Sequence, residues 1–538
     1  DFIRHDGSGW EKKMGGVDPR HLYSRIWDNF IIWPLHSAEI LSSDGNDGAF
    51  LLHVCSGGVY KRGKGISKMK PEVTLSGKEN CLSVSFGEIL YYLFWSFMLA
   101  AKGLGLYEGM RSYNLILVFS FSCILLKLLL EKHTWEELLL KGGLLLLGGL
   151  IYLNTGDKAP LINIMVIIGL KNVPVKRVFG LGLAVWSVSF GWRAFSEVTG
   201  IRTGLALVHD KLGLGPVLRW SFGLTHPNVL QISYAVLAAF ILYVTQRKGK
   251  RLLALIGLLF LGNCYVFLYS VSYTGIILVT LFLLIFCYFM MRRQFSRVEK
   301  VLMQCVFPCC ILISIVAPYM IDTSGIIRAI GQLLNKAVNN RFLASSVYLS
   351  YGIAPFGKNL VSENISFALD SSYISLLVND GWVIFFLTVA AYFCTIRDYV
   401  RQDKRKELAI MLSFLIAGIS EPFLFNTAFK NLSLVFIGEY LFRMLARRES
   451  REYGFGIALK RENVKIPFAR AKQWLEKAKR CLNAGNRKRG IICLSIIVGI
   501  AVGILYWTLA PEPDAVYIAV GNTDCGKREE IYLDITEL

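Results

Sequence analysis

The chain has 538 residues, of which 54% are hydrophobic, and its mean hydropathy is +0.47. This composition excludes an ordinary soluble protein and indicates a polytopic membrane protein. The formal charge of +20 is spread over short segments between apolar runs, as is typical of cytoplasmic loops, and therefore does not indicate nucleic-acid binding.

The N-terminal segment, residues 1–85, contains no apolar run long enough to span a bilayer. Its basic stretch at 61–68 precedes Met69 and consists largely of residue types with purine-rich codons. A bacterial ribosome-binding site, which is also purine-rich, would give such residues if it were translated by mistake. Two hypotheses stay open: the native start is Met69, or the segment is a small basic cytoplasmic domain.

From residue 86 onward, apolar runs alternate with polar segments and predict an all-α fold with about 12–13 transmembrane helices. The runs at 138–153 and 160–170 are short for a bilayer about 30 Å thick, and either tilt little or form a re-entrant pair. The predicted spans are 86–102, 113–130, 138–153, 160–170, 178–198, 227–245, 252–269, 274–291, 301–319, 381–397, 408–420, 430–446 and 491–509.

Alternate loops differ in charge, and this difference predicts the orientation of the helices. Short loops around 171–177, 247–251, 292–300 and 397–406 are densely basic and are therefore expected on the cytoplasmic side. The intervening loops carry few charges. We therefore expect 199–226, 270–273, 320–380 and 420–430 on the outer face.

The long outer loop at 320–380 is expected to be helical. Apolar residues at 326, 327, 330, 333, 334, 337 and 338 recur at helical spacing and predict an amphipathic helix against the membrane surface or a protein groove, ending at Arg341. A turn at Pro355 follows. Asp370 then begins a further helix, for which it is a suitable N-cap.

The C-terminal part adds three predicted segments to the body at 86–446. Residues 447–490 have an apolar stripe covered by basic residues, which is typical of a cytoplasmic helix on an anionic leaflet. An additional transmembrane helix at 491–509 follows. Residues 510–538 then form an extracytoplasmic tail with two candidate strands.

The outer loop at 199–226 carries Arg202 and Arg219 and ends at His226, Pro227 and Asn228. Proline suits the first turn of a helix, and Thr225 or His226 can cap it. A well-formed helix start is thus the structural interpretation of His226. Arg193, inside a predicted span, is a stronger functional candidate because an intramembrane cation is expensive to bury.

Several motifs in order resemble the O-antigen polymerase and O-antigen ligase family of bacterial envelope enzymes. They are SFGLTHPN at 221–228, LYSVSYTG at 268–275, NNRF at 339–342, APFG at 354–357 and LDSSYISLLVNDGW at 369–382, within a resemblance that covers roughly 90–446. The resemblance implies a GT-C-like membrane body with its active site at the outer face. It also implies a reaction without metal or cofactor.

The sequence departs from the family pattern at two places. Ser272, Tyr273 and Thr274 stand where the family usually shows Ser-Arg-Thr, so one cation expected near the site is missing. Ligases commonly carry a His-Asn pair where this chain has Asp370 with Tyr373, which favours a polymerase over a ligase.

Transfer of a sugar chain from a polyprenyl pyrophosphate needs a base for the acceptor hydroxyl and positive charge for the departing pyrophosphate. The sequence has no Asp-x-Asp motif, no CxxC pair and no Cys/His cluster, so it predicts no metal. Arginines and lysines must then supply the charge, and arginine does so with bidentate geometry. The predicted catalytic residues are Asp370 as base, His226 and Arg341. The predicted substrate-binding residues are Arg193, Arg202, Arg219, Asn228, Ser272, Tyr273 and Tyr373.

Structural interpretations compete with these roles. Arg341 would complement the dipole at a helix end, Asp370 would cap a helix, and Arg202 and Arg219 would be solvated loop charges. Three acids at membrane boundaries, Glu88, Glu421 and Glu439, are expected to pair between helices.

The expected function is polymerisation of undecaprenyl-pyrophosphate-linked oligosaccharide repeat units into capsular, exopolysaccharide or O-antigen chains at the bacterial cytoplasmic membrane. The resemblance implies as partners the lipid-linked oligosaccharide, the bilayer and assembly proteins such as a chain-length regulator. A ligase and a lipid-linked oligosaccharide flippase or other transporter remain alternatives. A transporter should show internal repeats and midplane ionisable groups, whereas here no repeat is visible and polar residues gather at the outer edge.

Overall fold

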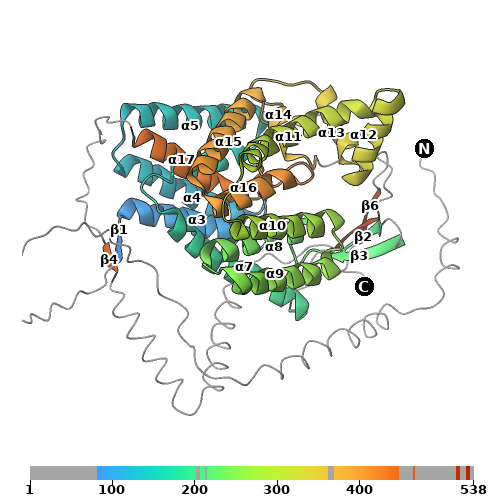
Figure 1. Cartoon of the computed structure of the whole chain (residues 1–538), viewed down its shortest axis with the longest axis horizontal. Helices are drawn as coiled ribbons and strands as arrows, with labels where there is room; N and C mark the ends of the chain where they lie inside the picture. Colours follow the sequence, from blue (N-terminus) through green and yellow to red (C-terminus); the bar gives the residue numbers. More distant parts are fainter. Residues whose placement is uncertain are drawn as a thin grey trace, which may run out of the picture. The chain divides into compact units, whose positions relative to one another are not determined.

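The computed structural model describes residues 82–201, 206–211, 215–360, 369–447, 464–466, 516–520 and 529–533 (Figure 1). The segment before residue 82, the helix predicted at 491–509 and nearly all of the basic segment 447–490 lie outside these residues. What is described is dominated by helices, as the apolar runs predicted.

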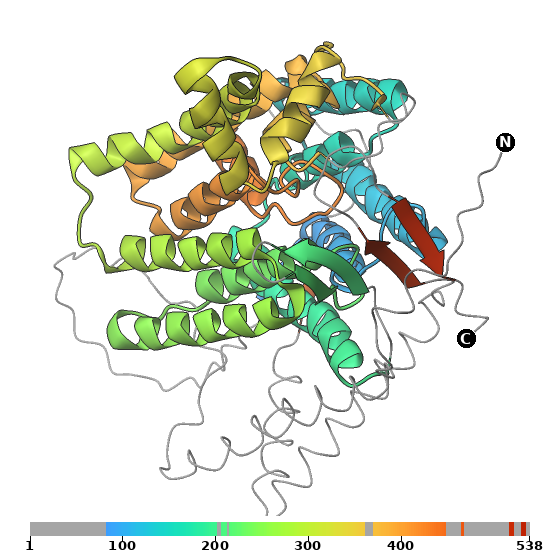
Figure 2. The ribbon, with the colours of Figure 1, turned by 90° about the vertical axis from the view of Figure 1, so that its right-hand side faces the viewer.

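Eight helices in the described part are long and apolar enough to cross a membrane. They are α4 (Arg111–Leu130), α5 (Trp135–Thr155), α7 (Val175–Val198), α8 (Pro227–Val244), α9 (Gly249–Ser270), α10 (Tyr273–Met291), α11 (Arg297–Ile321) and α15 (Trp382–Gln402). An all-α polytopic membrane fold is thereby supported. Helices α8, α9 and α10 lie side by side (Figures 1 and 2).

The remaining predicted spans are shorter or more polar than a simple crossing requires. α16 (Arg405–Ala417) and α17 (Ser433–Leu445) have 13 residues each, about 20 Å of helix against a core of about 30 Å, and α6 (Ala159–Ile168) has 10. α3 (Phe86–Gly103) buries the charged Glu88 and Lys102. In contrast, α5 was predicted to be short, but it is not. It has 21 residues, because Thr134 caps it and the helix begins at Trp135, three residues before the predicted start at 138.

The long loop forms three short helices, α12 (Gly325–Ala337), α13 (Arg341–Ser350) and α14 (Ser372–Val378). The predicted amphipathic helix is confirmed as α12, whose Ile326 and Leu333 are 80% and 69% exposed. The prediction that Arg341 ends it was wrong. Asn339 and Asn340 adopt positive φ values of 57° and 62°, which stop α12, and Arg341 begins α13.

Short antiparallel strand pairs accompany the helices. β2 (Ala206–Lys211) pairs with β3 (Gly215–Trp220) in the segment predicted as an irregular loop, and positions Arg219 opposite Leu207. β1 (Leu82–Val84) pairs with β4 (Val464–Ile466), and β5 (Val516–Val520) pairs with β6 (Glu529–Leu533). β5 is the first candidate strand of the tail, and β6 begins two residues before the second, IYLDI. The all-α prediction therefore needs this small correction.

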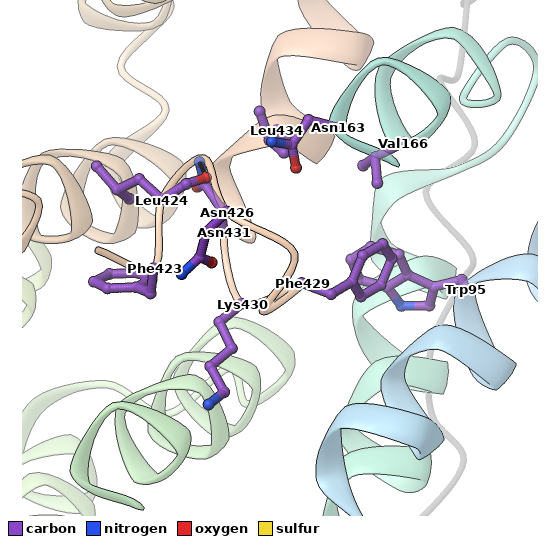
Figure 3. A pocket seen from close by; sticks show the side chains of 10 residues that line it. All are labelled: Trp95, Asn163, Val166, Phe423, Leu424, Asn426, Phe429, Lys430, Asn431 and Leu434. Atoms are coloured by element: carbon purple, nitrogen blue, oxygen red, sulfur yellow. Dashed lines mark hydrogen bonds between the residues drawn. The ribbon is translucent and has the colours of Figure 1, made fainter. Parts of the chain in front are cut away.

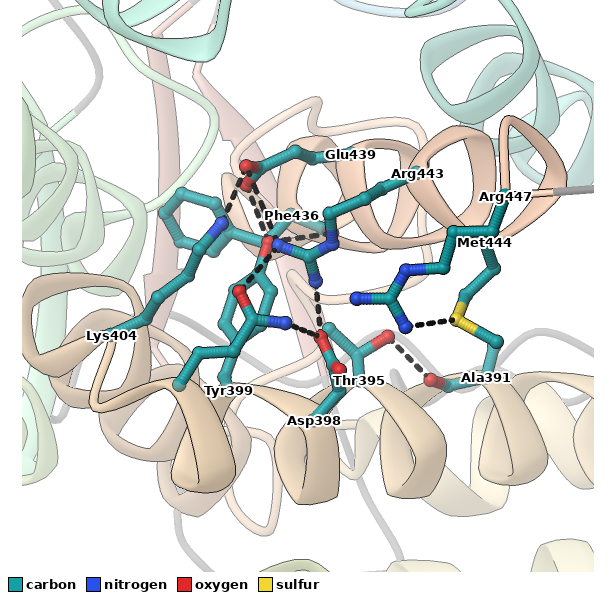
Figure 4. Close-up of polar contacts among 11 residues, drawn as sticks. Ala391, Thr395, Asp398, Tyr399, Lys404, Phe436, Glu439, Arg443, Met444 and Arg447 are labelled. Atoms are coloured by element: carbon teal, nitrogen blue, oxygen red, sulfur yellow. Dashed lines mark hydrogen bonds and ion pairs between the residues drawn. The ribbon is translucent and has the colours of Figure 1, made fainter. Parts of the chain in front are cut away.

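The helices have two distinct ends, which we call the basic end and the loop end. At the basic end, where α15 ends and α16 begins, Arg443 of α17 pairs with Asp398 of α15, and Lys404 pairs with Glu439 at 2.5 Å (Figure 4). Glu88 likewise pairs with Arg177 at 2.8 Å. The pairing predicted for Glu88 and Glu439 is thus confirmed. The loop end lies at the opposite helix termini and carries α12 to α14 and the β2–β3 hairpin.

Candidate functional site

Arg341 is the centre of the candidate site. Its guanidinium lies 2.8 Å from the Glu421 carboxylate through Nη1 and 3.0 Å from Asp370 through Nε. The first contact is a hydrogen bond, whereas the second is an ion pair without hydrogen-bond geometry. Arg341 is 6% exposed and Glu421 3%, while the Asp370 side chain is 34% exposed. One acid is therefore buried with the arginine, and the other is partly exposed.

The position of Arg341 contradicts its structural interpretation. It is the first residue of α13, where the helix dipole is positive and disfavours a cation. Asp370 does not cap α14 either, because the N-cap residue is Ser371 and no side chain accepts a capping hydrogen bond there. Neither charge is explained by stabilising a helix end, so both remain available for chemistry.

A second buried arginine, Arg219, comes from the β2–β3 hairpin. Arg219 is 1% exposed and donates from Nε to the Ser270 carbonyl at 2.8 Å and from Nη2 to Asn228 Oδ1 at 2.7 Å. These acceptors are neutral, so they position the guanidinium without cancelling its charge. The competing interpretation of Arg219 as a solvated loop charge was therefore wrong.

His226 begins α8 as the sequence predicted. Its Nδ1 accepts from the Asn228 backbone N–H at 3.1 Å, and Pro227 occupies the first turn. The cap fixes the position of Asn228, which in turn accepts from Arg219. His226, Asn228 and Arg219 thus form one connected group.

The start of α10 supports the acid of the first group. Thr274 donates from Oγ1 to Glu421 Oε1 at 3.0 Å, and Ser272 caps the helix by accepting from the Gly275 N–H at 3.2 Å. Gly275 packs on Gln231, which accepts from Ser270 Oγ at 2.8 Å. Ser272 therefore orients the backbone next to the site, while Tyr273 beside it is 38% exposed.

The charges of these groups act on each other. Burial lowers the pKa of Arg219 to about 10, and Glu421 and Arg341 are the charges that act on it. Burial favours neutral Arg341, but the charges of Glu421 and Asp370 outweigh burial and raise its pKa. Burial also raises the pKa of Glu421, against the charge of Arg341. Both arginines stay charged at neutral pH, and the pKa of Glu421 is shifted upward, as is common for a general base.

Two predicted site residues lie apart from this group, and one lies outside the described residues. Tyr373 is fully buried and donates to the Leu415 carbonyl at 2.6 Å, so the structure places it in the core. Arg193 is 9% exposed and donates from Nε to the Phe222 carbonyl at 3.0 Å, where it supports the turn before His226. Arg202 is the residue outside the described part.

The turn held by Arg193 gives a prediction for stability. Gly223 has φ +64°, and a Cβ there would lie 1.3 Å from Arg193 Nη2. Gly223→Ala is therefore expected to destabilise the protein by about 1–3 kcal/mol, because alanine disfavours the positive φ and the Arg193 side chain must move. Thermal unfolding in detergent measures the effect. Gly191→Ala on α7 is the matched control, since a Cβ there meets nothing within 4 Å, and equal melting temperatures for both variants would contradict the packing described.

The loop between α16 and α17 brings a further cation, Lys430, which is 3% exposed. A small pocket, with room for about one water molecule, lies beside it and is lined by Trp95, Phe429 and several asparagines (Figure 3). The amides of Asn163 and Asn431 donate to loop carbonyls, of Phe425 at 2.9 Å and Leu424 at 2.8 Å. The pocket is thus too small for a sugar, and its amides fix the loop that carries Lys430.

Sequence reasoning missed Glu421, Thr274 and Lys430 as site residues. Glu421 was expected to pair between helices; it does form an ion pair, but from the loop after α16, and its partner Arg341 is 80 positions away and could not be named from the sequence. A signal for Glu421 was its place beside Pro422 at the end of an apolar run. Lys430 had a comparable signal as an isolated cation before the next apolar run. Comparison with protein-family models, with curated proteins and with solved structures finds no match for this chain.

Proposed function

We propose that this protein is a membrane glycosyltransferase that polymerises polyprenyl-pyrophosphate-linked oligosaccharide repeat units. The observation that carries the proposal is Arg341, which is buried at the loop end between the buried carboxylate of Glu421 and the partly exposed carboxylate of Asp370. Arg219 is a second buried arginine, and the charges of Glu421 and Arg341 act on it. Buried charges carry a desolvation cost even when they are paired, and charged groups in such surroundings are more frequent at functional sites. Two of these residues, Arg341 and Asp370, lie in motifs that resemble the polymerase and ligase family, whereas Arg219 and Glu421 lie outside them.

In the proposed reaction, a hydroxyl of the acceptor repeat attacks the anomeric carbon of the donor chain. The new C–O bond forms as the bond to the pyrophosphate oxygen breaks, and the pyrophosphate leaves with the electron pair. The hydroxyl proton passes to a carboxylate, Asp370 or Glu421. Arg341 and Arg219 stabilise the charge that develops on the pyrophosphate, with Asn228 and His226 positioning Arg219.

The location we propose is the bacterial cytoplasmic membrane, with the loop end outside. Chain length in the native host tests the function. Deleting the gene should leave lipid-linked glycan of a single repeat, and the wild-type gene should restore a ladder. A ligase would instead leave long lipid-linked chains without their final acceptor, and unchanged glycan after deletion would overturn both.

The orientation gives a separate prediction, which depends on the basic residues between α10 and α11. Cysteine at Ser350, exposed on α13, should react in intact cells with a membrane-impermeant thiol reagent. Cysteine at Arg293, exposed at the basic end, should react only after the membrane is opened. The parent protein, whose own cysteines include Cys305 and Cys309, is the control. Labelling of position 293 alone in intact cells would reverse the orientation.

A further inference from the structure

The turn between α9 and α10 links the two arginines of the candidate site through hydrogen bonds at its two ends. Ser270 closes α9, and its carbonyl accepts from Arg219 Nε at 2.8 Å. Thr274, in the first turn of α10, donates to the Glu421 carboxylate at 3.0 Å, and the same carboxylate accepts from Arg341 at 2.8 Å. Ser270 and Thr274 are four residues apart, so their Cα atoms lie at most about 14 Å apart. The conformation of this turn therefore sets how Arg219 lies relative to the Glu421–Arg341 pair.

The turn has a backbone conformation that its own residue disfavours. α9 ends at Ser270 and α10 begins at Tyr273, so Val271 and Ser272 connect the two helices. Val271 adopts φ +40° and ψ +45°, the left-handed region, where glycine or asparagine is usual and a β-branched residue is an outlier. Such a conformation is costly and persists only where surrounding contacts impose it. Contacts on either side of Val271 must therefore hold the turn.

The side chain of Gln231 on α8 contacts the chain on both sides of Val271. Its Oε1 accepts from Ser270 Oγ at 2.8 Å. A Cβ added at Gly275 would lie 2.5 Å from Gln231 Cγ, so the first turn of α10 packs closely on the same side chain. Ser272 adds a cap by accepting from the Gly275 N–H at 3.2 Å. Gln231 is itself fully buried, so it holds the ends of both helices in place.

A second buried amide, Asn263 of α9, fixes Gln231 in turn. Gln231 Nε2 donates to the side-chain oxygen of Asn263, and Asn263 Nδ2 donates to Thr280 Oγ1 of α10 at 3.1 Å. The three helices α8, α9 and α10 lie side by side, and both amides are fully buried between them (Figure 2). Buried amides between membrane helices often serve only to hold the helices together. Here the chain of hydrogen bonds also ends at the turn that holds the site arginines, which helix association alone does not require.

We propose that Gln231 is a positioning residue, which holds the α9–α10 turn so that Arg219 and Arg341 are placed to contact one pyrophosphate. The inference rests on the proposed function, in which both arginines stabilise the same departing pyrophosphate. Gln231 is buried away from any substrate. It acts on Arg219 through Ser270, and on Glu421 through the start of α10. Misplacing a catalytic group by about 1 Å can cost about a hundredfold in rate, so two arginines from distant segments need a rigid support of this kind.

Binding of pyrophosphate to the full-length protein in detergent tests this role, with inorganic pyrophosphate as the probe in titration calorimetry. Gln231→Met keeps the length of the side chain but removes its hydrogen bonds, and should weaken binding roughly tenfold. Tyr234→Phe is the matched control and should bind as the wild type does, because Tyr234 also joins α8 to α9 but donates to the Leu259 carbonyl, at 2.7 Å, away from the turn. Val271→Gly relieves the unfavourable φ and frees the turn, so it should weaken binding at an unchanged melting temperature.

Coupling to Arg219 separates positioning from a general loss of stability. If Gln231 acts through Arg219, Gln231→Met should weaken binding much less in a protein that already carries Arg219→Ala, whereas independent losses would multiply. Losses that multiply, or wild-type affinity in both Gln231→Met and Val271→Gly, would overturn the inference and leave the proposed function standing. Val271→Gly decides alone if Gln231→Met does not fold.

The proposed function fails in a different way. Coupling between Gln231 and Arg219, together with unchanged glycan after deletion of the gene, would support the positioning role and overturn the polymerase. Absence of pyrophosphate binding in the wild type would overturn the positioning role, while glycan chain length in the native host would still decide the polymerase.

Discussion

Arg341→Ala is expected to reduce polymerisation roughly a hundredfold, since one well-placed charge contact in such a site contributes about 3 kcal/mol to the transition state. Arg341→Lys keeps the charge but loses the planar fork, and should retain part of the activity. The measurement is the rate at which lipid-linked glycan grows at equal amounts of folded protein. Normal chain growth by Arg341→Ala would remove the arginine from the proposed mechanism.

Stability must be separated from activity in this experiment. Removing Arg341 leaves Glu421 buried without its partner, which typically costs about 3–5 kcal/mol. Adding Glu421→Gln removes the stranded charge and should restore much of the melting temperature without restoring growth. Arg443→Ala is the matched control at the basic end, because it also breaks arginine ion pairs, with Asp398 and Glu439, but far along the helices from the site (Figure 4). It should leave chain length unchanged.

The parts of the fold that could be predicted depend on local information. Long apolar runs identify helices such as α10, and the pattern from Ile326 to Leu333 identifies α12, because both follow from spacing within one segment. The start of α8 was also predictable, since Pro227 and its capping residue are adjacent. Helix ends were less predictable where no proline or glycine marks them. At Asn339 a positive φ, which the sequence does not reveal, stops the helix.

The candidate site was only partly predictable because its contacts join distant segments. Arg341 and Asp370 were predicted from their motifs, but Glu421 comes from the loop after α16. Arg219 is buried because it lies in a hairpin, from which its side chain donates to the Ser270 carbonyl at the end of α9. A strand of six residues beside a loop leaves little periodic signal. Tyr373 shows the opposite error. Its place in a family motif suggested substrate binding, whereas in this fold the same helix face is needed for the core.

The two carboxylates beside Arg341 differ in ways that make one of them the cleaner experimental target. Asp370 is one-third exposed and forms an ion pair without hydrogen-bond geometry, so its loss should cost at most about 1 kcal/mol of stability. Glu421 is buried, accepts from both Arg341 and Thr274, and supports the fold as well as the site. A loss of activity in Glu421→Gln alone would therefore mix two causes.

Asp370→Asn should collapse chain length while the melting temperature stays within a few degrees of the wild type. An amide preserves the size of the side chain but cannot accept the acceptor proton, and loss of a general base typically costs about 10²–10⁴ in rate. Since Asp370 caps no helix, a structural explanation for such a loss is weak. Glu421→Gln, compared at equal folded protein, completes the pair. A normal ladder from Asp370→Asn together with a single-repeat product from Glu421→Gln would move the base to Glu421, whose burial already shifts its pKa upward. Normal ladders from both would leave His226 as the remaining candidate or remove the need for a protein base, and with it the proposed proton transfer.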